Sequence, residues 1–140
     1  MKNLPHFVLL DDDMFALSLA RKVILNYNRH AEIISFSVAR EAIAYIVPGD
    51  LSEDITGKQE DTVFLTDLHM PEMNGFELLD QMESMFKSLA KWLNIFVLSA
   101  DATPDETRKL LSYNCVTGFY NKPLTVGHIK EIVDCIQYPL

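Results

Sequence analysis

Four apolar runs of the sequence each end at side chains that can do chemistry, namely carboxylates, a hydroxyl and an amine. Asp67 is the most informative of them, because it ends an apolar run and opens a turn that contains proline and glycine. Open α/β sheets place their ligands at the carboxyl ends of the strands. We therefore expect these side chains to form one site assembled from distant parts of the chain. They are Asp67 after residues 62–66, Asp11 and Asp12 after 7–10, Ser99 after 95–98, and Lys122 after 116–120.

Short apolar runs alternate along the chain with longer segments of helical period, which predicts the elements that position these side chains. Strands are predicted at 7–10, around Ile33-Ile34, at 62–66, at 94–98 and at 116–120. Helices are predicted at 14–27, 38–47 and 75–90, from Thr103 to Tyr113, and from Thr125 onward. The predicted N-caps are Asp13, Ser37, Thr103 (in a capping box with Glu106) and Thr125. Five strands alternating with five helices predict a mostly parallel sheet with helices on both faces.

Composition excludes several function classes. The 140 residues suit one domain, and a hydrophobic content of 49% favours a packed core over disorder. The net charge of −8 argues against direct nucleic-acid binding, which needs a basic face. No apolar stretch is long enough for membrane insertion and the amino terminus lacks a signal peptide, so we expect a cytoplasmic protein. Cys115 and Cys135 show no metal-binding spacing and are expected to be reduced packing residues.

Taken together, the four strand ends resemble those of the receiver domains of two-component response regulators, and the resemblance covers essentially the whole chain. The resemblance implies a CheY-like, flavodoxin-like (βα)5 fold, which is a doubly wound parallel sheet of five strands in the order 2-1-3-4-5. It also implies a single receiver domain over residues 1–140 with no output domain, either a stand-alone protein or a piece of a longer one. The matching features are Asp11-Asp12, Asp67 with Met70-Pro71 and Gly75, Ser99-Ala100, and Lys122-Pro123.

The resemblance implies a phosphoacceptor site that contains a divalent cation. Asp67 is the expected nucleophile, and the phosphoryl donor is a histidine kinase or a histidine phosphotransfer protein. Phosphoryl transfer requires neutralisation of the phosphoryl oxygens, which Mg²⁺ (or Mn²⁺) bound by carboxylates and carbonyls supplies. By resemblance, Asp12, Asp67 and the backbone carbonyl of His69 bind the ion, and Asp11 holds one of its waters. The three carboxylates then balance the charges of Mg²⁺ and Lys122.

Lys122 and Ser99 complete the expected site. By resemblance, Lys122 pairs with one phosphoryl oxygen, and Ser99 donates a hydrogen bond to another. The Lys122-Pro123 peptide bond is expected to be cis, which aims the amine into the site. His69 and Asp101 occupy positions at which receivers tune the lifetime of the acyl phosphate.

The resemblance also implies a switch that carries the signal to a partner. Phosphorylation draws the Ser99 hydroxyl inward and vacates space for the Phe119 ring, because a packed core has few intermediate arrangements. The Phe119 ring is expected to be partly inward even without phosphate. The helix from Thr103, the strand ending at Phe119 and the helix from Val126 then present a changed surface. We expect this surface to bind a downstream protein or a second copy of the chain.

Two other interpretations stay open at this level. The Asp11-x-Asp13 pair also resembles the nucleophile motif of haloacid-dehalogenase-type phosphatases, although the further acidic pair and the cap domain of those enzymes have no counterpart here. A receiver that acts only as an interaction module, without phosphorylation, is the second alternative. The segments 48–61 and 75–94 are longer than is usual in receivers, and each is either an element for the choice of a partner or an inert insertion.

Overall fold

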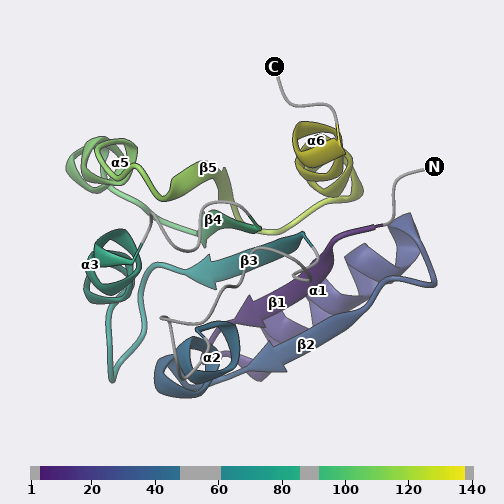
Figure 1. Cartoon of the computed structure of the whole chain (residues 1–140), viewed down its shortest axis with the longest axis horizontal. Coiled ribbons are helices and arrows are strands. Elements are labelled where there is room, and N and C mark those ends of the chain that lie inside the picture. Colours follow the sequence, from purple (N-terminus) through teal and green to yellow (C-terminus); the bar gives the residue numbers. More distant parts are fainter. Residues whose placement is uncertain (1–3, 48–60, 86–91, 138–140) are drawn as a thin grey trace.

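The computed structural model of the protein describes residues 4–47, 61–85 and 92–137. The strands form one five-stranded sheet in the order β2-β1-β3-β4-β5, and every pairing is parallel (Figure 1). The predicted strand order is therefore confirmed. The strands are β1 (His6–Leu10), β2 (Ile33–Phe36), β3 (Thr62–Asp67), β4 (Leu93–Ser99) and β5 (Val116–Asn121).

Helices cover both faces of this sheet (Figure 1). Phe7 and Leu9 of β1 belong to the core under α1 and α6, whereas Val8 and Leu10 belong to the core under α2, α3 and α5. Successive side chains of a strand point to opposite faces, so one short run supplies both cores. The helices are α1 (Met14–Tyr27), α2 (Ala39–Ile46), α3 (Gly75–Ser84), α5 (Pro104–Leu111) and α6 (Val126–Gln137).

The central strand β3 positions the most important carboxylate. Every residue of β3 is buried, as expected for a parallel strand that is covered on both faces. Asp67 is the last residue of β3, and the register pairs it with Leu98 of β4. The carboxylate of Asp67 is thus fixed at the carboxyl edge of the sheet by its most buried strand.

Side-chain caps begin three helices at this same edge, at the predicted residues Asp13, Thr103 and Thr125. The Thr125 hydroxyl accepts from the His128 N–H at 3.1 Å, at the start of α6. Asp13 Oδ1 accepts a hydrogen bond from the Phe15 N–H at 2.9 Å, at the start of α1. Thr103 begins α5 in the predicted capping box, because its hydroxyl accepts from the Glu106 N–H and the Glu106 carboxylate accepts from the Thr103 N–H. Asp13 is therefore a cap, and it leaves Asp11 and Asp12 free for another role.

The predicted cap of α2 is wrong. Val38 is the N-cap in place of Ser37, and its side chain makes no capping hydrogen bond. The backbone leaving β2 stays extended through Val38, whose carbonyl already accepts the Ala42 N–H at 3.2 Å. The start of α2 is therefore set by the extended path of the chain from β2. The preference of serine for the N-cap position does not determine it.

Three packing predictions are also wrong. The helical period of the predicted helices places Met14 and Val126 on apolar stripes that face the core, but both are exposed, in the first turns of α1 and α6. Cys135 is free and exposed, since it lies off the buried stripe formed by Ile129, Ile132 and Val133. Cys115 is free and buried, as predicted.

Some predictions fall outside the described residues. The long segment 48–61 lies outside them except for Asp61, and so does the last part of the helix predicted at 75–90. Within the described ranges, no helix is long and apolar enough to cross a membrane.

Candidate phosphoacceptor site

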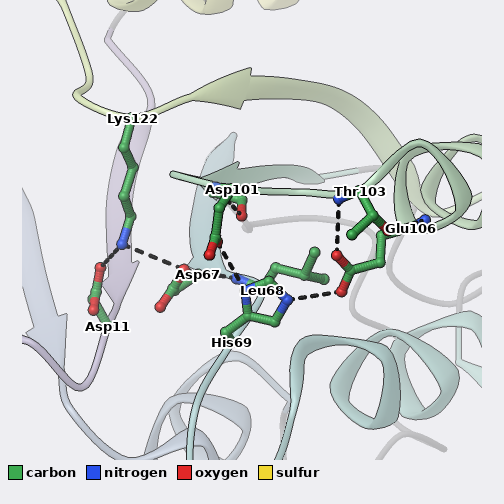
Figure 2. A network of polar contacts seen from close by, with 9 residues as sticks. Asp11, Asp67, Leu68, His69, Asp101, Thr103, Glu106 and Lys122 are labelled. Carbon is green, nitrogen blue, oxygen red and sulfur yellow. Dashed lines mark hydrogen bonds and ion pairs between the residues drawn. The ribbon is translucent and has the colours of Figure 1, made fainter.

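The carboxyl edge of the sheet brings Asp11, Asp67 and Lys122 together (Figure 2). Lys122 Nζ lies 2.6 Å from Asp11 Oδ2 and 3.3 Å from Asp67 Oδ1. Both carboxylates are about nine-tenths buried, with side-chain exposures of 9% and 10%. The peptide bond between Lys122 and Pro123 is cis, as predicted. Residues from the ends of three strands therefore meet in one charged cluster.

Backbone amides fix both buried carboxylates. Asp67 Oδ1 accepts a hydrogen bond from the Leu68 N–H at 2.9 Å. Asp11 Oδ1 accepts from the Asp13 N–H, also at 2.9 Å. These short-range contacts hold each carboxylate in one orientation, which is what a site for positioned chemistry requires.

The electrostatics of the cluster favour a further cation. Burial raises the pKa of the Asp67 carboxyl above its usual value, and the negative charge of Asp11 raises it further, while Lys122 and the Leu68 N–H act in the opposite direction without cancelling these effects. Burial lowers the pKa of the Lys122 amine, but its contacts with Asp11 and Asp67 outweigh burial and raise it. One lysine is thus shared by two carboxylates, and additional positive charge would favour the ionised form of Asp67.

The donor set of the cluster fits Mg²⁺. Asp11, Asp12 and Asp67 each offer a carboxylate oxygen, and these oxygens lie within 4.8 Å of one another. Oxygen ligands of this kind, with room for waters, are those that Mg²⁺ prefers. Asp12 is exposed, unlike the other two, so a bound ion at this place has access to solvent.

Gly75 allows the turn after Asp67 to close tightly. The Gly75 N–H donates to the Leu68 carbonyl at 2.7 Å. A β-carbon on Gly75 would lie 2.8 Å from both the α-carbon and the carbonyl oxygen of Leu68. Glycine is therefore required at position 75 for a steric reason, because α3 begins in contact with the backbone of Leu68.

The predicted switch residues occupy buried and half-buried places. Ser99 is fully buried, and its Oγ accepts a weak hydrogen bond of 3.4 Å from the Asp101 N–H. Phe119 is partly buried and packs against the core under α2, α3 and α5. It pairs in register with Val97, two residues before Ser99. The two side chains thus come from neighbouring strands of the sheet.

His69 is held by a contact that sequence reasoning did not find. Its Nε2 lies 2.7 Å from Glu106 Oε2, and its Nδ1 lies 3.4 Å from Asp101 Oδ1 (Figure 2). The hydrogen bond to Glu106 is the main cause that raises the pKa of the His69 imidazole. The capping box predicted a fixed Glu106 at the start of α5. No sequence signal indicated that its second oxygen faces His69.

Comparison with known proteins identifies a family that matches most of the chain. A family model described as response regulator receiver domain matches residues 7–134. Two-component response regulator ARR17 of Arabidopsis thaliana is 23% identical over 134 residues, which cover 94% of this chain and 84% of that protein. Sensory/regulatory protein RpfC of Xanthomonas campestris is 38% identical over 55 residues, which cover 39% of this chain. That match spans only 8% of the length of RpfC.

Solved structures share the fold. A two component response regulator from Cytophaga hutchinsonii matches with a TM-score of 0.82 at 24% identity, over 97% of this chain and 98% of that one. Chemotaxis response regulator CheY4 of Vibrio cholerae matches with a TM-score of 0.68 at 19% identity, over 96% of this chain and 99% of that one. At these identities, similarity to the solved structures shows the fold alone.

Proposed function

The chain belongs to the response regulator receiver domain family, and from that premise we propose that it is a phosphoacceptor signalling module in which Asp67 receives a phosphoryl group from a protein phosphohistidine. The observation that carries this proposal is the Lys122 amine held between two buried carboxylates, Asp11 and Asp67. A cation fixed at this place stabilises the negative charge of a phosphoryl group in the transition state of its transfer.

The two oxygens of Asp67 have different environments, which suggests which one reacts. Oδ1 accepts from the Leu68 N–H and faces Lys122. Oδ2 makes no hydrogen bond within the described part of the chain, and we propose it as the attacking atom. Attack forms an O–P bond and breaks the N–P bond of the donor imidazole, which takes a proton from solvent as it leaves. Lys122 and the Ser99 hydroxyl then contact the phosphoryl oxygens.

A divalent cation completes the proposed site. Asp12, Asp67 and the backbone carbonyl of His69 would hold Mg²⁺ (or Mn²⁺), with Asp11 on one of its waters. When bound, the ion neutralises negative charge on the phosphoryl oxygens. The cluster holds three carboxylates and one lysine, so it has an excess of negative charge. A divalent cation would balance it.

Labelling with a small phosphoryl donor tests this function. Incubation with acetyl phosphate and Mg²⁺ is expected to add the mass of one phosphoryl group to the wild type. Neither Asp67→Asn nor the wild type with EDTA should gain it. Asp13→Asn is the matched control and should be labelled normally, since Asp13 only caps α1. Label that persists in Asp67→Asn would sink the assignment, and label located on Asp11 would favour the phosphatase alternative.

The output of the module is proposed to be a protein contact. Phosphorylation would draw Ser99 toward the phosphoryl group and let the Phe119 ring move further into the core. The surface of α5, β5 and α6 then changes, and a downstream protein or a second copy of the chain binds it more tightly. This part of the proposal rests on the buried position of Ser99 and the half-buried position of Phe119 on neighbouring strands, where a shift of one side chain changes the packing of the other.

We further propose that the phosphodonor protein covers the start of α1. A pocket of about 140 Å³ there includes Phe15, Asp11, Lys122 and Pro123 in its lining. A donor histidine has to reach Asp67 at the same edge of the sheet, so its protein covers this surface. The Phe15 side chain, 76% exposed, then becomes buried in the complex.

A polar substitution of Phe15 tests where the donor docks. Phe15→Ser is expected to slow phosphoryl transfer from a protein donor by about tenfold or more, because truncation of a buried aromatic anchor weakens an interface by at least 1–2 kcal/mol. Labelling by acetyl phosphate should stay unchanged. Tyr45→Ser is the control, since Tyr45 is 48% exposed on α2 and contacts His6 at the opposite end of β1. Equal rates for Phe15→Ser and the wild type would contradict docking on α1.

A further inference from the structure

Glu106 links the start of α5 to the loop after Asp67, and the family resemblance implies no role for it. We propose that Glu106 is a positioning residue that holds the His69 imidazole beside Asp67 and thereby lengthens the life of the phosphoryl group. The inference rests on the proposed function, since it concerns the decay of an acyl phosphate on Asp67.

Both carboxylate oxygens of Glu106 are engaged. Oε1 accepts from the Thr103 N–H at 2.9 Å, and Oε2 lies 2.7 Å from His69 Nε2. The capping box therefore fixes the carboxylate before it meets the imidazole. Asp101 is a weaker partner, because its oxygen is 3.4 Å from Nδ1 and its side chain is 81% exposed, against 24% for Glu106. Glu106 is thus the contact that sets the orientation of the ring.

This orientation has a chemical consequence for hydrolysis. Because every residue of β3 is buried, water reaches the Asp67 carboxylate from the carboxyl edge of the sheet, where Figure 2 shows the His69 ring between Asp67 and Glu106. Both ring nitrogens face carboxylates, of Glu106 and Asp101, so the ring is held in one orientation. The tethered ring therefore obstructs attacking water. A ring released from Glu106 samples other rotamers and opens the path.

Glu106→Gln separates the tether from the cap. Glutamine serves as well as glutamate in a capping box, so the start of α5 is kept. Its single oxygen can accept either from Thr103 or from His69, but not from both, and its amide group can donate only to an unprotonated Nε2. The charge-assisted contact between the carboxylate and the imidazole is therefore lost while the fold remains. Glu77→Gln is the matched control, because Glu77 occupies the same position in the first turn of α3 and has no side-chain hydrogen bond within the described residues.

The test is the decay of protein labelled by acetyl phosphate, followed by mass spectrometry after removal of the donor at fixed Mg²⁺. Glu106→Gln is expected to decay about three- to tenfold faster than the wild type, the range that corresponds to one hydrogen bond. Glu77→Gln should decay at the wild-type rate. In a His69→Ala background, Glu106→Gln should have no further effect, because Glu106 acts through the imidazole.

Failure of the inference and failure of the proposed function give different results. A wild type that takes no label on Asp67 overturns the function. Normal labelling with an unchanged lifetime in Glu106→Gln overturns the positioning role, as does an equal acceleration with and without His69. The ¹⁵N shifts of the His69 imidazole give a readout that needs no phosphorylation, and they should change in Glu106→Gln but not in Glu77→Gln.

Discussion

Replacing Lys122 with methionine is expected to slow the phosphorylation of Asp67 by acetyl phosphate at least about a hundredfold, the usual loss when one preorganised charge-stabilising group is removed. Methionine keeps most of the side-chain volume and removes the charge. The amine is the cation that contacts both Asp11 and Asp67, and no other lysine or arginine forms an ion pair with either carboxylate in the described ranges. The rate of mass gain under saturating Mg²⁺ measures the effect. Lys130→Met, an exposed position on α6, is the control and should react normally.

Loss of Lys122 also leaves two buried carboxylates without their cation, so stability has to be measured beside the rate. Removing one partner of a fully buried ion pair destabilises a protein by about 3–5 kcal/mol, and the effect here should be smaller because Lys122 is 23% exposed. Thermal unfolding of Lys122→Met should therefore show a lower midpoint that Mg²⁺ partly restores. A folded variant that is labelled at the wild-type rate would remove Lys122 from the mechanism.

The central strands could be predicted because their middle residues are apolar. Residues 63–65 of β3 and 95–98 of β4 are apolar, because helices cover both faces of these strands. The edge strand β2 was predicted only around Ile33-Ile34, whereas it extends to Phe36. Its four residues are exposed or half-buried, so its sequence carries less of the apolar signal that marks a strand.

The candidate site could be predicted in outline because parallel topology brings strand ends together. Asp11, Asp67 and Lys122 each follow an apolar run, and their meeting follows from the order of the strands. The contact of His69 with Glu106 has no such basis. These two residues are 37 positions apart, and their distance depends on how α5 is set against the loop after β3. The capping box fixes where α5 begins, but the placement of α5 against a distant loop is decided by tertiary packing.

Gly75→Ala is expected to destabilise the fold by about 2–4 kcal/mol, the scale of a steric conflict that side-chain motion cannot relieve. The added β-carbon would lie 2.8 Å from the α-carbon and the carbonyl oxygen of Leu68, both of which are backbone atoms. Relief requires α3 to move away from Leu68, which weakens the 2.7 Å hydrogen bond from the Gly75 N–H. Leu68 follows Asp67 directly, so the carboxylate that we propose as the phosphoacceptor should shift as well. Thermal unfolding measures the first effect and acetyl phosphate labelling the second.

Gly127→Ala is the matched control, with the opposite expected sign. Gly127 lies in α6, and a β-carbon there would meet only the Thr125 hydroxyl oxygen, at an ordinary 3.6 Å. Alanine is favoured over glycine in a helix by up to about 1 kcal/mol, so this variant should melt at the same or a higher temperature and be labelled normally. If Gly75→Ala melts like Gly127→Ala, the close approach of α3 to Leu68 is not what requires glycine. If Gly75→Ala unfolds at a lower temperature than the wild type yet is labelled at the wild-type rate, the turn holds α3 in place without positioning Asp67.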